Sequence, residues 1–130
     1  MRRRYNSVLI LAAGVVVGLA ASSAIRAQQP KPPARYLIAE VKVTDPATFK
    51  QYAAQVPATL APFGGRYLVR AGKITPVEGD APKGGIVVIA FDSVGQAEAW
   101  ENSKAYEAIK PLRHKSATSR IFVVQGAPAQ

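Results

Sequence analysis

The sequence predicts one small α+β domain with the element order β-α-β-β-α-β. Three observations lead to this fold class. Residues 36–43 alternate between apolar and polar side chains, two stretches carry apolar residues at helical spacing after capping signals, and apolar runs flank a glycine-rich connection. This order is a doubled split β-α-β unit, in which both helices cover one face of a four-stranded antiparallel sheet.

The residues before the domain have the pattern of an export signal. Residues 1–4 (MRRR) supply positive charge, residues 8–21 form an uncharged apolar run, and small residues follow in SSAIRAQQ. This pattern is typical of a secretory signal peptide at residues 1–27, cleaved after Ala24 or Ala27. The apolar run is shorter than the ~20 residues that span a bilayer, which favours cleavage over a retained membrane anchor. The arginine pair leaves a twin-arginine route open as the alternative to the general one.

The mature protein is therefore expected to be periplasmic or secreted, with only a transient membrane contact through the signal peptide. Residues 28–34 (QQPKPPA) contain three prolines and are expected to form a proline-rich linker. The domain is expected at residues 35–126, and residues 127–130 are expected to be a disordered tail.

Composition excludes several classes of function. The chain has no cysteine, which excludes thiol catalysis, thiolate metal sites and disulfides. Its formal charge of +9 falls to +5 without the four arginines of residues 1–27, because 13 basic and 8 acidic residues remain. The remaining basic residues form no stripe, so no nucleic-acid partner is expected. A single histidine without a carboxylate cluster is a poor metal site, and neither a metal nor a cofactor is expected.

The first strand and helix follow from local pattern. Residues 36–43 (YLIAEVKV) predict a half-buried strand. Thr44 or Asp45 can cap the next helix, and Pro46 suits its first turn. Pro57 is expected to kink or restart this helix, because proline lacks an N–H and clashes one turn back. The apolar face of the helix comprises Phe49, Tyr52, Ala53, Val56 and Leu60.

The middle of the chain predicts a hairpin. Gly64 and Gly65 end the helix and permit positive φ. The second strand begins at Arg66 in RYLVRAG, and residues 74–85 form a long connection with two prolines and three glycines. Residues 86–91 (IVVIAF) are apolar on both faces, which predicts a central strand.

The last third predicts a broken helix and a strand. Asp92 and Ser93 can cap a helix that continues through Trp100, and Ser103 restarts it as a shorter helix. Pro111 is expected to close or bend that shorter helix. Residues 120–125 (RIFVVQ) form the last strand.

The sheet face away from the helices is expected to need a cover. On this strand assignment it carries four apolar residues: Ile38, Leu68, Val88 and Val123. An exposed apolar sheet face is unfavourable in water. The simplest cover is the same face of a second copy, which predicts a homodimer.

Three segments together resemble the DUF1330 family of uncharacterised small proteins: YLIAEVKVTDPATFKQY, FGGRYLVRAG and VVIAFDSVGQAEAWENSKAYEAIKPLR. The most specific parts are GGRYLVR and WENSKAY. Lys104 departs from the family, which usually has proline there, and Pro111 and His114 lie outside its pattern. The resemblance implies a ferredoxin-like fold and a dimeric α/β barrel, in which two subunits press their sheets together. It implies no established activity.

The segment AWENSKAYEAIKPLRHK, residues 99–115, gathers most candidate site residues. Trp100 lies at core spacing, which favours packing over ligand contact. Asn102 and Ser103 mark a helix break, where short polar side chains satisfy free N–H groups. Tyr106 and Arg113 are the better binding candidates, because a hydroxyl and a guanidinium can converge on an acidic or carbonyl group.

The sheet supplies a second group of candidates. Glu40 and Arg70 are both assigned to the open face, where an ion pair in an apolar pocket is the structural interpretation. In the functional alternative, Arg70 receives an acidic ligand group and Tyr52 or Tyr106 orients it. His114 lies between two basic residues and is interpreted as a surface residue.

Two functions remain open at this stage. The first is binding of a small acidic or aromatic molecule in a pocket formed by the open sheet face and residues 100–113 of a dimer. Resemblance to the superfamily implies, as a further possibility for this first function, cofactor-independent oxygenase or isomerase chemistry. The second is a non-catalytic structural or stress-related dimer without ligand. No catalytic residue is assigned, and the candidate ligand-binding residues are Arg70, Tyr52, Tyr106, Arg113, Glu40, Trp100 and Asn102.

Overall fold

The computed structural model describes residues 31–129, and the signal peptide predicted for residues 1–27 lies outside them. From Pro32 onward the described residues form one compact unit. The elements are β1 (Arg35–Val43), α2 (Pro46–Leu60), a short 3₁₀ turn η1 (Ala61–Phe63), β2 (Arg66–Arg70), β3 (Gly85–Phe91), α3 (Val94–Glu101), α4 (Lys104–Ser116) and β4 (Ala117–Gln125). The predicted α+β fold is confirmed, with the second helix broken into α3 and α4.

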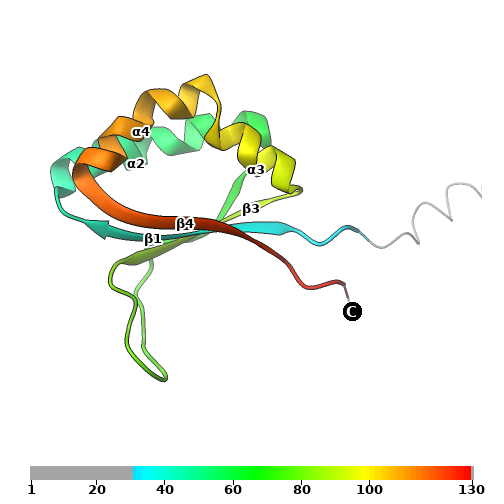
Figure 1. The fold of residues 1–130 in the computed structure, drawn as a ribbon, viewed down its shortest axis with the longest axis horizontal. Coiled ribbons are helices and arrows are strands. Elements are labelled where there is room, and N and C mark those ends of the chain that lie inside the picture. Colours follow the sequence, from blue (N-terminus) through cyan, green and yellow to red (C-terminus); the bar gives the residue numbers. More distant parts are fainter. Residues whose placement is uncertain (1–30, 130) are drawn as a thin grey trace, which may run out of the picture. The chain divides into compact units, whose positions relative to one another are not determined.

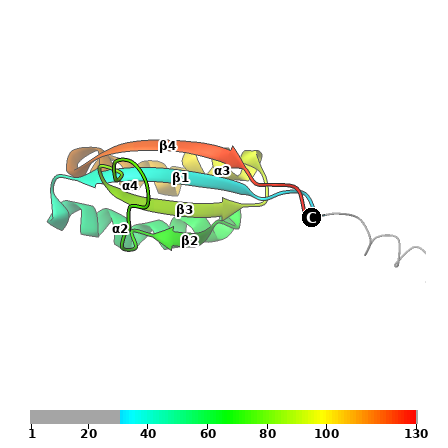
Figure 2. The same ribbon diagram turned by 90° about the horizontal axis from the view of Figure 1, so that it is seen from below.

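The four strands form one antiparallel sheet in the order β2-β3-β1-β4. The prediction that residues 86–91 form a central strand is confirmed, because β3 lies between β2 and β1. The helices α2, α3 and α4 cover one face, and the loop between β2 and β3 extends on the other side (Figure 1). Figure 2 shows that other face, where no helix of the described chain lies in front of the strands. No helix within residues 31–129 has the length and apolarity that a bilayer crossing requires.

The apolar core lies between the helices and the sheet. The alternation of β1 turns Leu37, Ala39 and Val41 toward the helices, and all three are buried. Phe91 at the end of β3 and Tyr106 of α4 are fully buried in the same layer. The helix-side residues of β1 therefore form the floor on which any internal site must rest.

Polar caps determine where the helices begin, as predicted. Asp45 accepts a hydrogen bond from the backbone N–H of Thr48 (3.2 Å), which starts α2. Ser93 does the same for α3 (3.1 Å), and Ser103 for α4 (3.3 Å). The break at Ser103 matters for function, because it sets the direction in which α4 carries its side chains over the sheet.

The two prolines do not interrupt their helices, so the expected restart at Pro57 and the expected close at Pro111 are wrong, while the alternative of a kink or bend stays a prediction. Pro57 lies inside α2 and Pro111 inside α4, and both helices continue beyond them. Pro57 leaves the carbonyl of Ala53, four residues earlier, without its helical donor. Arg70 of β2 replaces that donor, with Nη2 at 2.9 Å from the Ala53 oxygen. A hydrogen bond from the sheet thus satisfies the carbonyl that the proline leaves free.

The assignment of Val123 to the open face is wrong. Val123 pairs with Leu37, whose side chain is buried under the helices, so Val123 is on the helix side. Phe122 pairs with Ile38 and takes its place on the open face. The pattern could not decide between these two phases, because residues 121–124 are all apolar.

The assignment of Arg70 to the open face is also wrong. The register between β2 and β3 shifts between Tyr67 and Val69, which leaves Leu68 as an extra residue in a bulge. Arg70 consequently pairs with Val87, which lies on the helix side of β3. A single inserted residue therefore moves the arginine to the opposite face of the sheet.

Candidate functional site

A cavity of about 280 Å³ lies between the helix layer and the sheet. Its floor is the helix side of β1 and β3, and side chains of α2 and α4 cover it. Apolar residues dominate the lining. The predicted site residues that line this cavity therefore meet on the helix side of the sheet and not on the open face, where their pocket was expected.

The cavity brings together five of the seven candidate residues. Tyr52, Arg70, Trp100, Tyr106 and Arg113 all contribute to its lining. They come from α2, β2, α3 and α4, so residues far apart in the sequence meet at one place.

Glu40 and Asn102 do not belong to this cavity. Glu40 lies on the open face, where its carboxylate pairs with Arg120 of β4 at 3.3 Å, so the expected pair with Arg70 is wrong. Asn102 is exposed and ends α3. His114 is exposed on α4, as expected for a surface residue.

Three aromatic side chains form one wall of the cavity. The ring centroids of Trp100 and Tyr106 are 4.0 Å apart, and Tyr52 meets Tyr106 edge to face at 6.3 Å. The Trp100 indole N–H donates to Thr59 Oγ1 at 2.9 Å, and that hydroxyl donates to the carbonyl of Val56 at 2.7 Å. Trp100 is 2% exposed, so it serves the core and lines the cavity at once.

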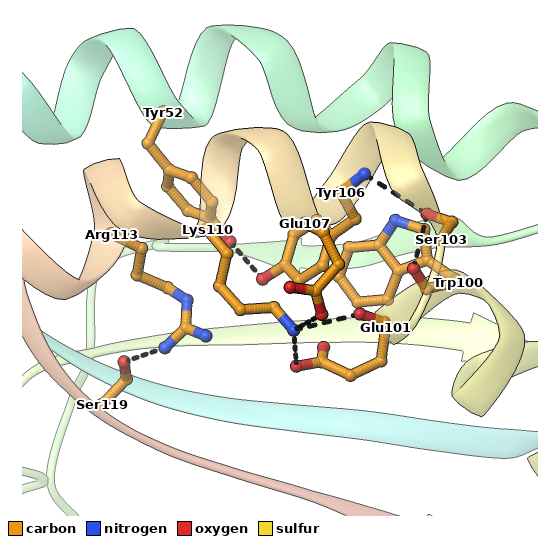
Figure 3. Close-up of polar contacts among 9 residues, drawn as sticks. All are labelled: Tyr52, Trp100, Glu101, Ser103, Tyr106, Glu107, Lys110, Arg113 and Ser119. Atoms are coloured by element: carbon orange, nitrogen blue, oxygen red, sulfur yellow. Dashed lines mark hydrogen bonds and ion pairs between the residues drawn. The ribbon is translucent and has the colours of Figure 1, made fainter.

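The hydroxyl oxygens of Tyr52 and Tyr106 lie 2.8 Å apart in a buried hydrogen bond (Figure 3). Burial raises the pKa of Tyr52, the adjacent Tyr106 raises it further, and the charge of Arg113 only partly opposes this. The Tyr52 phenol is therefore protonated at neutral pH. One O–H of the pair donates to the other, so one hydrogen is left without a protein acceptor among the described residues.

Arg113 lies in the last turn of α4, and its side chain extends toward the sheet (Figure 3). The residue is only 8% exposed. Its Nη1 donates to the hydroxyl of Ser119 at 2.7 Å, whereas its Nε is buried without a hydrogen-bond partner within residues 31–129. None of the ion pairs in that part of the chain includes Arg113.

Lys110, one turn earlier on α4, shows the opposite situation. Its Nζ pairs with the carboxylates of Glu107 (2.6 Å) and Glu101 (3.1 Å) and also donates to the Glu101 carbonyl (3.0 Å). Desolvation acts to lower the pKa of Lys110, but these hydrogen bonds outweigh it and raise the pKa. The charge of Lys110 is therefore compensated by the protein itself.

Arg70 lies at the rim of the cavity. It is exposed, its Nη2 is bound to Ala53, and its guanidinium carbon lies 4.7 Å from the centroid of the Tyr67 ring. Burial raises the pKa of Tyr67, which the charge of Arg70 opposes. The next residue, Ala71, has φ 52°, a left-handed conformation that is unusual for alanine.

The polar groups of the cavity are suited to hold acceptor oxygens rather than metal ions. Within residues 31–129 no three His, Asp or Glu side chains gather at one place. Guanidinium and phenol groups donate hydrogen bonds, and a charged donor bonds most strongly to an anionic acceptor.

Sequence reasoning missed three residues of the site: Tyr67, Thr59 and Ser119. Tyr67 pairs with Ile89 on the helix side of the sheet, which the alternation of β2 before the bulge indicates. Thr59 holds the buried indole, and the only sequence signal is that a buried tryptophan needs an acceptor. Ser119 is revealed only by the β1–β4 register, in which it pairs with Val41 on the helix side.

The chain resembles known proteins in fold and in family. It is similar to the crystal structure of RPA0582, a protein of unknown function from Rhodopseudomonas palustris, with a TM-score of 0.61 and 12% identity over 85% of this chain and 94% of that one. It is also similar to SnoaB, a cofactor-independent oxygenase from Streptomyces nogalater, with a TM-score of 0.54 and 13% identity over 75% of this chain and 96% of that one. At such identities these likenesses show the ferredoxin-like fold alone. No functionally curated protein matches the chain. The family model "Domain of unknown function (DUF1330)" matches residues 34–127.

Proposed function

The chain belongs to the DUF1330 family, and from the geometry of its helix-side cavity we propose that it binds a small organic molecule with an aromatic or otherwise apolar body. One observation carries this proposal. An apolar cavity of about 280 Å³ is walled by Tyr52, Trp100 and Tyr106 beside a buried arginine. Small-molecule sites combine an apolar lining with a few polar groups in this way.

The size of the cavity limits the ligand. An engineered apolar cavity of about 150 Å³ is enough to bind benzene. A cavity of about 280 Å³ accommodates a single substituted ring, but not a haem or a flavin. The proposed ligand is therefore a compound the size of a substituted benzene or a short chain.

The experiment is a thermal-shift screen of the domain against single-ring aromatic compounds, both acidic and neutral. A ligand at a free concentration of 100 times its Kd stabilises the folded state by about 2.7 kcal/mol, which a thermal-shift assay easily measures. The test variant is Ala39→Leu, because Ala39 is buried in the cavity floor and a leucine there fills the space. The matched control is Ala54→Leu on the exposed side of α2.

A compound that stabilises the wild type and Ala54→Leu, but not a folded Ala39→Leu, supports the proposal. If no compound stabilises the wild type, the proposal fails. The non-catalytic structural dimer is then the better description of the protein.

A second candidate function is conversion of the bound molecule without a cofactor, as oxygenase or isomerase chemistry. The hydrogen-bonded tyrosine pair favours it, since one phenol hydrogen faces no protein acceptor among the described residues and could bond a ligand oxygen. SnoaB has cofactor-independent oxygenase activity on a similar fold, which supplies an analogy and no site residue. Chromatography coupled to mass spectrometry tests this candidate on binders incubated with the protein in air and under nitrogen. An oxygenase product gains mass in air alone, and an isomer keeps its mass but changes its retention time. A compound with unchanged mass and retention time in both cases would mean that the protein only binds it.

We also propose that two copies pair through the open faces of their sheets. Ile38, Val88 and Phe122 are neighbours across β3, β1 and β4 on this face, and Phe122 and Val124 are exposed. A monomer would leave this apolar strip in water, which is unfavourable. The same face of a second copy is self-complementary in a twofold pair.

We infer from residues 1–27 that the protein is exported and cleaved. The basic start, the apolar run and the small residues around Ala24 and Ala27 support this inference. Expression of the full chain followed by intact-mass measurement of the exported fraction tests it. The expected mass is that of a chain that begins at residue 25 or at residue 28. A product found only with its intact N-terminus would contradict it.

A further inference from the structure

We propose that the ligand of the helix-side cavity is an organic anion whose delocalised oxyanion, a carboxylate or an enolate, binds to Arg113. Its apolar body would lie against the Trp100–Tyr106 wall. This inference rests on the proposed function, because it specifies the chemical class of the molecule bound there.

The first argument is an uncompensated charge. Arg113 is 92% buried, being 8% exposed, and arginine keeps its proton in proteins. No carboxylate among residues 31–129 pairs with it. A buried charge without a partner costs several kcal/mol. The neighbouring Lys110, in contrast, pairs with two carboxylates, Glu101 of α3 and Glu107 of α4. The charge of Lys110 outside the cavity is therefore compensated, whereas the charge of Arg113 at the cavity is not.

The second argument concerns geometry at the guanidinium. Ser119 accepts the Nη1 hydrogen bond, and a serine hydroxyl brings no negative charge. Nε is buried and unpartnered. Arginine binds planar oxyanions through two parallel N–H donors. The vacant Nε–H is one such donor, and it belongs to a residue that lines the cavity.

The third argument comes from the tyrosine pair. Tyr52 and Tyr106 share one hydrogen bond, so one hydroxyl hydrogen is left over. Arg113 and this pair therefore each leave one donor without a protein partner among the described residues, an N–H and an O–H. Only a ligand that presents acceptor oxygens satisfies both, and an anionic acceptor also neutralises the charge of Arg113.

Arg70 is the other arginine of the cavity that could bind the anion, but in the structure it makes different contacts. Its Nη2 satisfies the carbonyl that Pro57 leaves free in α2, and its guanidinium lies over the Tyr67 ring. Arg70 is also exposed, so water already solvates its charge. These contacts make Arg70 the natural control for Arg113, as both are arginines of the same cavity.

The experiment compares benzoate with benzamide and toluene, which have similar shapes but no charge, by isothermal titration of the full mature chain. Wild type is expected to bind benzoate about 10–100-fold more tightly than benzamide, the worth of a charge-assisted hydrogen bond. Arg113→Met is expected to lose this preference. Arg70→Met is expected to keep it within about threefold. Folding of both variants is checked by thermal unfolding, and Arg113→Met is expected to unfold at no lower temperature than wild type, because it removes a buried unpaired charge.

The enolate alternative is tested with 4-nitrophenol, which absorbs visible light only as its phenolate. Binding to wild type at a pH below its free pKa is expected to increase the phenolate band, and Arg113→Met is expected to abolish that increase. A band or a benzoate preference that depends on Arg113 supports the proposal for the corresponding oxyanion.

The outcomes separate the two levels of inference. If benzamide and toluene bind as tightly as benzoate and no phenolate band appears, the anion proposal is overturned while small-molecule binding stands. If Arg70→Met abolishes the preference and Arg113→Met does not, the assignment to Arg113 is wrong. If no probe binds at all, the proposed function fails together with this inference.

Discussion

The hydroxyls of Tyr52 and Tyr106 join α2 to α4 through a bond that neither helix can replace. Each phenol is buried, so each depends on the other for a hydrogen-bond partner. Removing one hydroxyl leaves the other without its protein partner, whereas removing both leaves an apolar contact.

Tyr52→Phe and Tyr106→Phe are each expected to lower the free energy of unfolding by about 1–2 kcal/mol, and the double variant by less than their sum. Chemical denaturation of the four proteins of this cycle, without ligand, measures the coupling. Strictly additive effects would mean that the 2.8 Å contact does not contribute to stability.

The site residues that the sequence could predict are those whose position follows from helical spacing. Tyr52, Trp100, Tyr106 and Arg113 lie on helices with clear caps, so their common face follows from the period of the helix. Arg70 lies on a strand, where one bulged residue reverses the face. No alternation rule applied to RYLVR reveals that bulge.

At the scale of elements, α2 depends on a strand that is distant in the sequence. Pro57 removes one helical hydrogen bond, and Arg70 supplies a donor for the free carbonyl of Ala53. Pro57 and Arg70 therefore form one structural unit, which explains how α2 continues past Pro57 without a restart.

The effects on stability of substitutions at Arg70 and at Pro57 are expected to be coupled. Arg70→Ala is expected to lower the free energy of unfolding by about 1 kcal/mol in the wild type, the net worth of a hydrogen bond. In a Pro57→Ala background, where residue 57 regains an N–H for the Ala53 carbonyl, the same change is expected to cost clearly less. Urea denaturation of the four proteins gives the coupling energy, and equal costs in both backgrounds would refute the link.

The start of α2 has a measurable pH signature. Hydrogen bonds from the side chain and backbone of Thr48 lower the pKa of Asp45 below its ordinary 3.8. A carboxyl with a lowered pKa in the folded state stabilises the fold above its unfolded pKa, and this contribution is lost as the pH falls through the folded pKa.

Asp45→Asn is therefore expected to unfold at nearly the same denaturant midpoint as wild type at neutral pH, since asparagine caps equally well. Below about pH 4 the wild type should lose stability that the variant keeps. Denaturant midpoints measured from acid to neutral pH test this. A constant difference between the two proteins at all pH values would contradict it.

At the scale of the whole molecule, the sequence could predict the fold, because strand alternation, caps and the glycine-rich connection all agree. It could not identify which face holds the cavity. That depends on the register of β2 and β4, which only pairing with β3 and β1 fixes.

The proposed pairing of two sheets is tested on the open face. Phe122→Glu places a charge opposite Ile38 and is expected to convert the dimer to a folded monomer in sedimentation velocity at micromolar concentration. Ala54→Glu, on the exposed side of α2 in the helix layer, is the control and should leave the mass unchanged. A wild type that sediments as a folded monomer would refute the pairing.

The bulge at Leu68 keeps Arg70 on the cavity side of the sheet. If Leu68 instead paired with Val88 in a regular ladder, Val69 and Arg70 would each move one position along β3 and change face. The guanidinium of Arg70 would then leave α2 for the outer surface, and the side chain of Val69 would enter the helix layer. Deletion of Leu68, in contrast, removes the bulge and leaves Val69 opposite Val88 and Arg70 opposite Val87, so a strand one residue shorter preserves the cavity rim.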